Sequence, residues 1–345
     1  MDAVPLHAVA PGRYAGVCPS CRRVTLATDG CAWSCPCGAS GTFEEAARAA
    51  VLAPPVAEVL ADAAEWFSEQ LWSEKGAWVR AYLLSRGVSR EAMREFALGW
   101  SPRDLGLVRR LMGLGRTADE IAAAGLLERC NGGLLYRYRF RDRVMFPVRS
   151  RDGVVAGFAG RALGESSRKW VNSPGSVFPK SRVLYGLDRL SVVSGPVLLV
   201  EGYLDVVVLQ SRGWPALGTM GTSLTNAQAD LVAGLAGEVV VLFDGDPPGR
   251  KAAARAAALL ESRGVIVRVG VLPEGRDPDE LALSGELAGV VESAVPGWEF
   301  RARQGVEGLS DQEAAAVLAS LVAEARDARE RDLRLARAQE MLAAV

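Results

Sequence analysis

Short apolar runs alternate with helical segments through residues 196–285, and this alternation limits the possible folds more strongly than any other feature. The runs VLLV, PALGT, EVVVLF and VIVRVGVL are each followed by a segment with helical spacing of apolar residues. These segments are, in order, YLDVVVLQSRG, NAQADLVAGLAG, GRKAAARAAALLESRG and DPDELAL. Strands that alternate with helices form mostly parallel sheets with crossover connections. We therefore predict an α/β domain here.

Acidic residues follow three of these predicted strands, in the pairs Glu201 and Asp205, Asp244 and Asp246, and Asp277 and Asp279. Ligands bind to open parallel sheets outside the carboxyl ends of the strands, so we expect these carboxylates to converge. Such a cluster is costly unless cations neutralise it. Mg²⁺ and Mn²⁺ prefer oxygen ligands, and paired ions suit phosphoryl transfer. The pattern predicts a catalytic site for two or more such ions, although a single Asp-Gly-Asp would also suit a turn.

A basic segment stands directly before this acidic one. Residues 129–182 carry twelve Arg or Lys against three acids, whereas residues 196–285 carry eleven acids against seven bases. A polyanion held against a carboxylate cluster would explain this arrangement, and so would an ordinary solvated surface. Charge alone leaves both interpretations open.

Five of the six cysteines crowd near the N-terminus, at Cys18, Cys21, Cys31, Cys35 and Cys37. The start of the chain lacks a signal-peptide pattern, and no apolar stretch of membrane-spanning length follows it. We therefore expect a cytoplasmic protein without a membrane partner, where crowded cysteines favour a metal over disulfides. A CxxC pair followed by a CxC pair suits one structural zinc ion with four thiolate ligands, Cys31 being the alternative to Cys35.

The remaining segments predict further helices and strands. Residues 56–127 and the last fifty residues have helical character, the latter in two or three helices. The runs LLYRYRF, RVMFPVRS and VVAGFAGRA predict a twisted antiparallel sheet. We expect a multi-domain protein of the α/β class that combines a mostly parallel α/β domain with separate helical and antiparallel parts, so that the chain as a whole is α+β. Its predicted parts are a zinc-binding domain (1–50), a helical and antiparallel-sheet part (51–195), a mostly parallel α/β domain (196–285) and C-terminal helices (286–345).

These motifs resemble a known family. Glu201-Gly202-Tyr203-Leu204-Asp205 and Asp244-Gly245-Asp246 are similar to the TOPRIM module of DnaG-type primases, type IA topoisomerases and some nucleases. FRDRVMFPVRSRDGVVAGFAGRAL, KWVNSP and FPKSRVLYGL resemble the segment specific to DnaG-type primases. The resemblance runs from about Cys18 to the end of the chain. It implies a zinc ribbon, an RNA polymerase core with its TOPRIM part, and a short form that lacks a helicase-interaction domain.

The resemblance implies synthesis of short RNA primers on a single-stranded DNA template from ribonucleoside triphosphates. All six acids would belong to the catalytic site, with Mg²⁺ held by Glu201, Asp244, Asp246 and Asp277. Glu201 would be either a metal ligand or a general base. Asp205 and Asp279 would complete or orient the set. A replicative helicase is a further expected partner, through a surface that the sequence does not identify.

The resemblance also implies a basic ridge that guides template and primer. Thr222 and Ser223 precede a predicted helix, where they would help to bind a triphosphate, cap the helix, or do both. The residues expected to contact nucleic acid or nucleotide are Arg143, Arg161, Lys169, Asn172, Lys180, Tyr185, Thr222, Ser223 and Arg250. Two alternatives stay open: another TOPRIM enzyme, such as a nuclease or topoisomerase-like protein, and a non-catalytic zinc-containing protein that binds single-stranded DNA.

Overall fold

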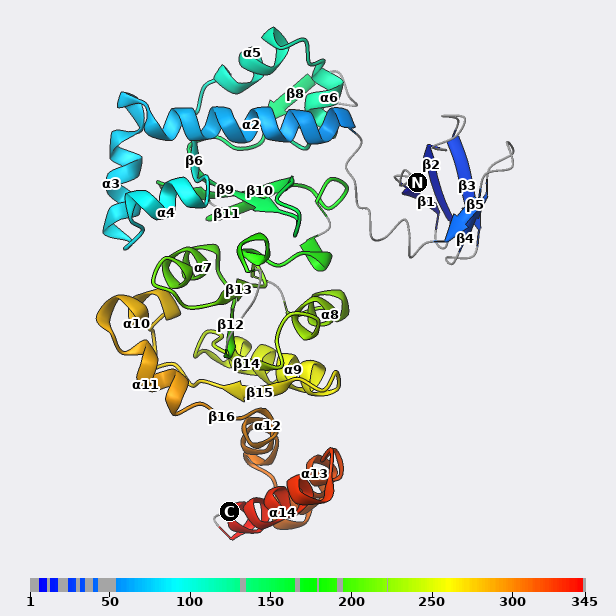
Figure 1. Cartoon of the computed structure of the whole chain (residues 1–345), viewed down its shortest axis with the longest axis vertical. Helices are drawn as coiled ribbons and strands as arrows, with labels where there is room; N and C mark the ends of the chain where they lie inside the picture. Colours follow the sequence, from blue (N-terminus) through cyan, green and yellow to red (C-terminus); the bar gives the residue numbers. More distant parts are fainter. Residues whose placement is uncertain are drawn as a thin grey trace. The chain divides into compact units, whose positions relative to one another are not determined.

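A computed structural model describes residues 54–343, apart from residues 131–134, 165–167, 179, 191–194 and 222, together with five short strands nearer the N-terminus (Figure 1). These strands are β1 (Leu6–Ala10), β2 (Arg13–Val17), β3 (Val24–Thr28), β4 (Ala32–Ser34) and β5 (Ser40–Thr42). Strands β1, β2 and β3 form one antiparallel sheet, and β4 pairs with β5. The four expected zinc ligands, Cys18, Cys21, Cys35 and Cys37, and the alternative ligand Cys31 lie outside the described residues.

The chain folds into two compact units, each assembled from separate stretches of sequence. The first comprises Met1–Lys75, Gly99–Pro147 and Val154–Phe178, and the second comprises Gly76–Leu98, Val148–Gly153 and Pro179–Val345. The four consecutive parts expected from the sequence are a different division, and their boundaries stay a prediction.

The first unit surrounds a core in which helix α2 packs against strands. The rings of Phe67 on α2 and Phe158 pack edge to face, with their centroids 5.2 Å apart, and Phe158 also packs edge to face against Phe140. A side chain at Gly99 would place its Cβ 2.4 Å from the Cβ of Phe67, so glycine permits this close approach. The elements are α2 (Pro54–Trp72), β6 (Gly99–Ser101), α5 (Gly106–Gly113), α6 (Ala118–Ala123), β7 (Leu127–Cys130), β8 (Leu135–Tyr138), β9 (Arg143–Arg149), β10 (Val155–Ala162) and β11 (Trp170–Asn172).

The antiparallel sheet differs from its prediction in membership. Strands β11, β10, β9 and β6 form a four-stranded sheet in that order. The LLYRYRF run supplies β8, which was expected in this sheet but pairs with β7 in a separate two-stranded ribbon. The prediction was wrong here because β7, its neighbour in the sequence, provides the hydrogen-bonding partners of β8.

The second unit contains the predicted parallel sheet. Its strand order is β13-β12-β14-β15-β16, with parallel pairing everywhere except at the short edge strand β16. Helices α7 and α10 cover one face, and α8 and α9 cover the other (Figure 1). The elements are β12 (Val197–Val200), α7 (Tyr203–Gln210), β13 (Ala216–Gly218), α8 (Asn226–Ala233), β14 (Glu238–Val241), α9 (Pro247–Glu261), β15 (Ile266–Val269), α10 (Pro278–Ser284) and β16 (Val295–Pro296).

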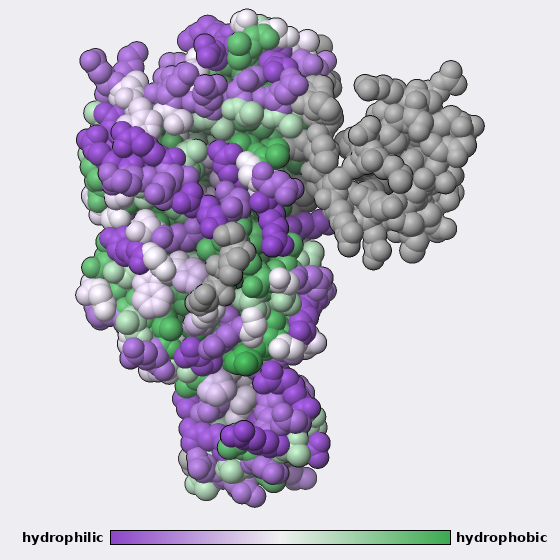
Figure 2. Space-filling view, in the orientation of Figure 1, coloured by the Kyte–Doolittle hydropathy of each residue, from purple (hydrophilic) through white to green (hydrophobic). Residues whose placement is uncertain are grey.

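Further helices from several parts of the sequence complete the second unit. The C-terminal segment forms α12, α13 and α14 around their own apolar cluster, as predicted, and the visible face of these helices is predominantly hydrophilic (Figure 2). Among the described residues, no helix has both the length and the apolar character needed to cross a membrane. The elements are η1 (Glu74–Gly76), α3 (Ala77–Ser85), α4 (Arg90–Glu95), η3 (Lys180–Arg182), η4 (Leu187–Arg189), α11 (Leu287–Glu292), α12 (Gly297–Val306), α13 (Asp311–Ala323) and α14 (Ala328–Leu342).

Candidate active site

The six acids all follow the carboxyl ends of β12, β14 and β15. The register places Leu199 opposite Val241, and Val241 opposite Val269, so these three strands end at one edge of the sheet. Glu201 accepts a hydrogen bond of 3.3 Å at Oε1 from the backbone N–H of Asp244. This bond joins the segments that leave β12 and β14.

Neighbouring negative charges disfavour ionisation in this group. Burial raises the pKa of Glu201, and the charges of Asp244 and Asp246 raise it further. Asp244 reaches solvent, yet partial desolvation followed by the charges of Asp277 and Asp246 raises its pKa as well. Burial is the larger cause of both shifts, and a cation bound beside these carboxylates would relieve the part that is due to repulsion.

The donor set fits a hard divalent cation. Carboxylate oxygens are the ligands that Mg²⁺ prefers, and Asp244, Asp246 and Asp277 are exposed enough to be reached. Within the part of the chain that the structure describes, no three Asp, Glu, His or Cys side chains already form a complete set of metal ligands.

Asp246 has a structural role that the sequence interpretation missed. Its Oδ1 accepts a hydrogen bond of 2.7 Å from the backbone N–H of Gly249, which makes it the N-cap of α9. A Cβ on Gly249 would lie 2.2 Å from the backbone oxygen of Asp244, so the loop and the helix need glycine there. An Asp directly before Pro247 at the first helical position is a recognisable start signal, and it could have been found.

Asp205 and Asp279 lie deeper than the other acids. Asp205 accepts a hydrogen bond of 3.1 Å from the backbone N–H of Gly202. Burial raises the pKa of Asp205 to about 8, with further contributions from the charges of Asp279, Asp277 and Asp244. Asp279 is buried and pairs with Arg86, a residue that the sequence interpretation did not select.

In the first unit, Arg143 is buried instead of facing solvent. Its guanidinium donates to the carbonyl oxygens of Gly160 and Arg168, both at 3.0 Å, and of Lys169 at 3.3 Å. Burial lowers the pKa of Arg143. This side chain therefore ties β9 to β10 and to the segment before β11. Its expected contact with nucleic acid stays a prediction.

Three other expected contact residues lie on or beside the same sheet. Arg161 of β10 stands over the ring of Trp170, with its Cζ atom 5.6 Å from the ring centroid. Lys169 is exposed, and Asn172 of β11 is partly exposed. The structure thus brings Arg161, Lys169 and Asn172 together on the β10–β11 part of the first unit.

Two more expected contact residues belong to the second unit. Lys180 lies in η3, where burial lowers its pKa. Tyr185 is buried, and its backbone exchanges hydrogen bonds with Gly218 at the end of β13. The Tyr185 side chain packs edge to face against Tyr203, with ring centroids 5.0 Å apart.

The helix after β13 corrects one part of the prediction. Thr225 caps α8, since its Oγ1 accepts from the backbone N–H of Gln228 at 3.2 Å and the Gln228 side chain accepts from Thr225. Capping by Thr222 or Ser223 is therefore wrong, because Thr225 and Gln228 form a capping box further along the chain. Thr222 lies outside the described residues, and Ser223 is exposed beside Arg255.

Arg250 lies in the first turn of α9 and belongs to the acidic loop. Its guanidinium donates to the carbonyl oxygen of Gly245, between Asp244 and Asp246. Arg250 therefore steadies the loop that carries two of the acids. Its expected contact with a nucleotide stays a prediction.

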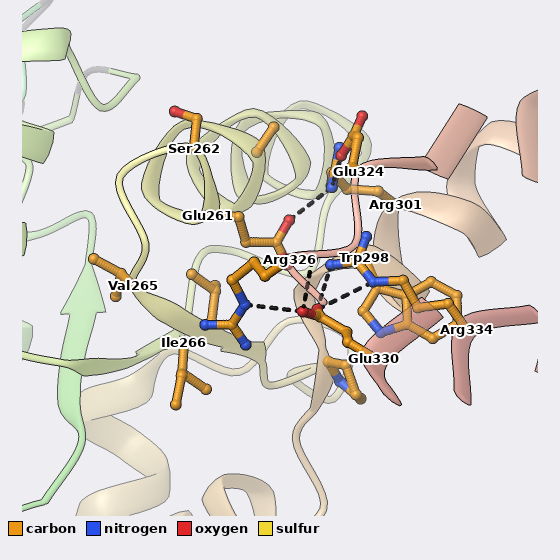
Figure 3. A pocket seen from close by; sticks show the side chains of 13 residues that line it. Glu261, Ser262, Val265, Ile266, Trp298, Arg301, Glu324, Arg326, Glu330 and Arg334 are labelled. Carbon is orange, nitrogen blue, oxygen red and sulfur yellow. Dashed lines mark hydrogen bonds and ion pairs between the residues drawn. The ribbon is translucent and has the colours of Figure 1, made fainter. Parts of the chain in front are cut away.

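A separate cavity of about 460 Å³ lies between α9, β15, α12 and the start of α14 (Figure 3). None of the six acids lines it. Its charged side chains are linked to one another: Arg301 pairs with Glu261 and Glu324, and Glu330 pairs with Arg326 and Arg334. This internal neutralisation favours a structural role for the cavity walls, which join the C-terminal helices to the sheet.

Two family matches cover most of the described chain. Residues 66–191 match the family described as "DNA primase catalytic core, N-terminal domain". Residues 198–282, which hold all six acids, match the family described as "Toprim-like".

Individual relatives agree with these matches. A DNA primase of Clostridium acetobutylicum is 34% identical over 265 residues, which cover 74% of this chain and 44% of the relative. The chain thus spans less than half the length of this curated relative. The structure of a DnaG primase catalytic domain bound to ssDNA superposes with a TM-score of 0.74 and 29% identity, covering 83% of this chain and 98% of that one.

A third comparison includes the N-terminal residues. The Aquifex aeolicus primase structure with zinc-binding and RNA polymerase domains has a TM-score of 0.71 and 28% identity, covering 97% of this chain and 91% of that chain. Fold, acidic motifs and relatives agree. The chain therefore belongs to the DnaG-type primase family, in which it carries the primase catalytic core with its Toprim domain.

Proposed function

We propose that this chain is a DNA primase that makes short RNA primers on single-stranded DNA by metal-dependent nucleotidyl transfer. The observation that carries the proposal is the hydrogen bond between Glu201 and Asp244, which joins two acidic strand ends within a primase-type core. The raised pKa values of both residues support a cation site at this edge. A neighbour whose title describes bound ssDNA supports single-stranded DNA as the template.

The reaction joins the 3′-hydroxyl oxygen of the primer to the α-phosphorus of a ribonucleoside triphosphate, and pyrophosphate leaves. Glu201, Asp244, Asp246 and Asp277 would hold Mg²⁺ or Mn²⁺. When bound, the ions neutralise phosphate charge and activate the reacting oxygens. Glu201 serves either as a ligand or as the base that accepts the hydroxyl proton, and its raised pKa suits the second role.

The remaining acids and Arg250 act as supports in this proposal. Asp205 and Asp279 orient the segments that follow β12 and β15. Arg250 holds the loop of Asp244 and Asp246 through the Gly245 carbonyl. Such support keeps catalytic groups in a reactive arrangement before substrate arrives.

The basic side chains would bind the phosphates of template and primer. Lys169 and Arg161 supply exposed and partly exposed charge beside Asn172. Lys180 and the Ser223 region of the second unit would contact nucleotide or primer. Contacts of this kind depend on salt and select sequence weakly.

The N-terminal cysteines would hold one structural zinc ion. Cys18, Cys21 and Cys37 would be ligands, with Cys35 or Cys31 as the fourth. The zinc-binding neighbour that aligns with 97% of this chain supports this assignment. The mass of the intact folded protein, measured before and after treatment with a chelator, tests this assignment. We expect the chelator to remove the mass of one zinc ion, and an unchanged mass would contradict the assignment.

A single incubation separates the proposed reaction from its alternatives. Purified protein is mixed with circular single-stranded DNA, labelled ribonucleoside triphosphates and Mg²⁺, and the products are treated with alkali. We expect short, alkali-sensitive products whose sequence is complementary to the circle. Cleavage or relinking of the DNA would indicate another TOPRIM activity, and binding without synthesis would indicate a non-catalytic protein.

A further inference from the structure

An ion pair connects the end of α3 with the acidic edge of the sheet. Arg86 Nη2 donates to Asp279 Oδ2 at 3.1 Å, across 193 positions of sequence. The Asp279 side chain is only 2% exposed, and that of Arg86 is 30% exposed. A carboxylate removed from water to this extent is costly without a counter-charge, and Arg86 supplies one.

Asp279 in turn lies close to another of the acids, Asp205. The Oδ1 atom of Asp279 accepts a hydrogen bond of 2.9 Å from the backbone N–H of Glu280. Helices α7 and α10 pack against each other, and after burial the charge of Asp279 is the next cause that raises the pKa of Asp205. Asp205 accepts a hydrogen bond from the N–H of Gly202, directly after Glu201. Arg86 is thus linked to the residue beside Glu201 by its ion pair with Asp279, by the proximity of Asp279 to Asp205, and by the hydrogen bond from Gly202 to Asp205.

The residues around Arg86 hold it in a fixed position. Gly87 has a positive φ of 76°, and a Cβ there would lie 2.4 Å from the side chain of Leu283 on α10. Arg212 donates to the Gly87 carbonyl at 3.4 Å. The end of α3 is therefore packed directly on α10, the helix whose N-cap is Asp277.

We infer that Arg86 is a positioning residue of the cation site: it neutralises Asp279 and fixes the start of α10, and through Asp279 and Asp205 it holds the segment that carries Glu201. Asp279 then acts as the anchor of this network, and Asp277, two residues earlier, is one of the proposed ligands. This inference rests on the proposed function, because it concerns the same site. It assigns a role to a residue outside the TOPRIM segment.

The test measures Mn²⁺ binding directly, from the electron paramagnetic resonance signal of free Mn²⁺, with no nucleotide or DNA present. Arg86→Ala should bind Mn²⁺ about 10- to 100-fold more weakly, which is the range typical of residues that orient metal ligands without binding the ion. Arg86→Lys keeps the charge without the planar fork and should recover part of the affinity. Arg86→Ala combined with Asp279→Asn should bind better than Arg86→Ala alone, because no buried carboxylate is left without a partner.

Arg189→Ala is the matched control. Arg189 of η4 joins the end of α4, since it donates to the backbone oxygen and to the side chain of Glu95, both at 2.8 Å. Its ion pair is with Glu95 and not with one of the six acids. Its loss should leave Mn²⁺ affinity unchanged. Equal Mn²⁺ affinity of wild type and Arg86→Ala, or an equal loss in Arg189→Ala, would overturn the inference. If Arg86→Ala does not fold, Arg86→Lys and its combination with Asp279→Asn decide the question.

Different results would contradict primer synthesis and the role of Arg86. A wild type that binds Mn²⁺ but makes no RNA contradicts priming and leaves the role of Arg86 intact. The role of Arg86 alone is contradicted by a different pair of results. In that case the wild type makes RNA, and both Arg86→Lys and Arg86→Ala bind Mn²⁺ as tightly as the wild type does.

Discussion

The carboxylate of Asp246 accepts a hydrogen bond of 2.7 Å from the backbone N–H of Gly249, so a proposed cation ligand is also the N-cap of a helix. Asparagine caps helices as well as aspartate does, whereas alanine does not. We expect Asp246→Ala to lower the free energy of unfolding by about 1 kcal/mol and Asp246→Asn to leave it near the wild-type value. Both variants should lose primer synthesis. Urea unfolding measures the first effect, and equal stability of the two variants would contradict the capping role.

Gly249 allows α9 to begin close to the acidic loop. An added Cβ would meet the Asp244 backbone oxygen at 2.2 Å, so Gly249→Ala should displace that loop and cost about 1–3 kcal/mol of stability. Primer synthesis should fall with it. Gly289→Ala is the control, since a Cβ at Gly289 meets nothing within 4 Å. A Gly249→Ala protein with normal stability and activity would show that the loop does not depend on this contact.

Asp205 predicts a specific pH dependence of stability. Its pKa is about 8 in the folded protein against an ordinary value of 3.8, so the folded state retains a proton that the unfolded chain has lost between these values. The stability that this residue contributes is complete below pH 3.8 and is lost as the pH rises towards 8. Without divalent cations, Asp205→Asn should therefore gain stability relative to wild type as the pH increases. Urea unfolding across this range measures it, and parallel pH profiles would contradict it.

Lys169 tests the phosphate contacts of the basic segment. It is exposed, so Lys169→Ala should leave the fold intact and weaken binding of single-stranded DNA. The slope of log affinity against log salt should decrease by about 0.7 for one lost phosphate contact. Fluorescence anisotropy at several salt concentrations gives this slope. An unchanged slope would remove Lys169 from the binding surface.

The parallel sheet and its acidic edge could be predicted because both depend on local patterns. Buried parallel strands appear as continuous apolar runs, and Glu201 and Asp244 directly follow such runs. The caps Asp246 and Thr225 also had local signals, in a following proline and a glutamine three residues later. The same positions also suit other roles: Asp246 fits a metal ligand, and Thr222 and Ser223, which stand just before Thr225, fit a helix cap equally well by residue type.

Other features could not be obtained from the sequence in this way. Arg86 and Asp279 are 193 positions apart, and the sequence around either residue contains no signal that predicts their pairing. Twelve bases in residues 129–182 indicated a charged segment, but only packing shows that Arg143 is buried against carbonyl groups. The pairing of β8 with β7 could not be predicted either, because the neighbouring predicted strands have similar apolar patterns and local sequence does not decide which of them pair.

In the proposed function, the carboxylates at the strand ends support primer synthesis. The most direct measurement compares RNA synthesis on single-stranded DNA by wild type and by the Asp244→Asn/Asp246→Asn variant, which keeps the α9 cap. Asp230→Asn, an exposed acid on α8 paired with Arg263, is the control. We predict short RNA from wild type and from Asp230→Asn, and a loss of at least about 100-fold in the double variant. Undiminished synthesis by the folded double variant would contradict the account.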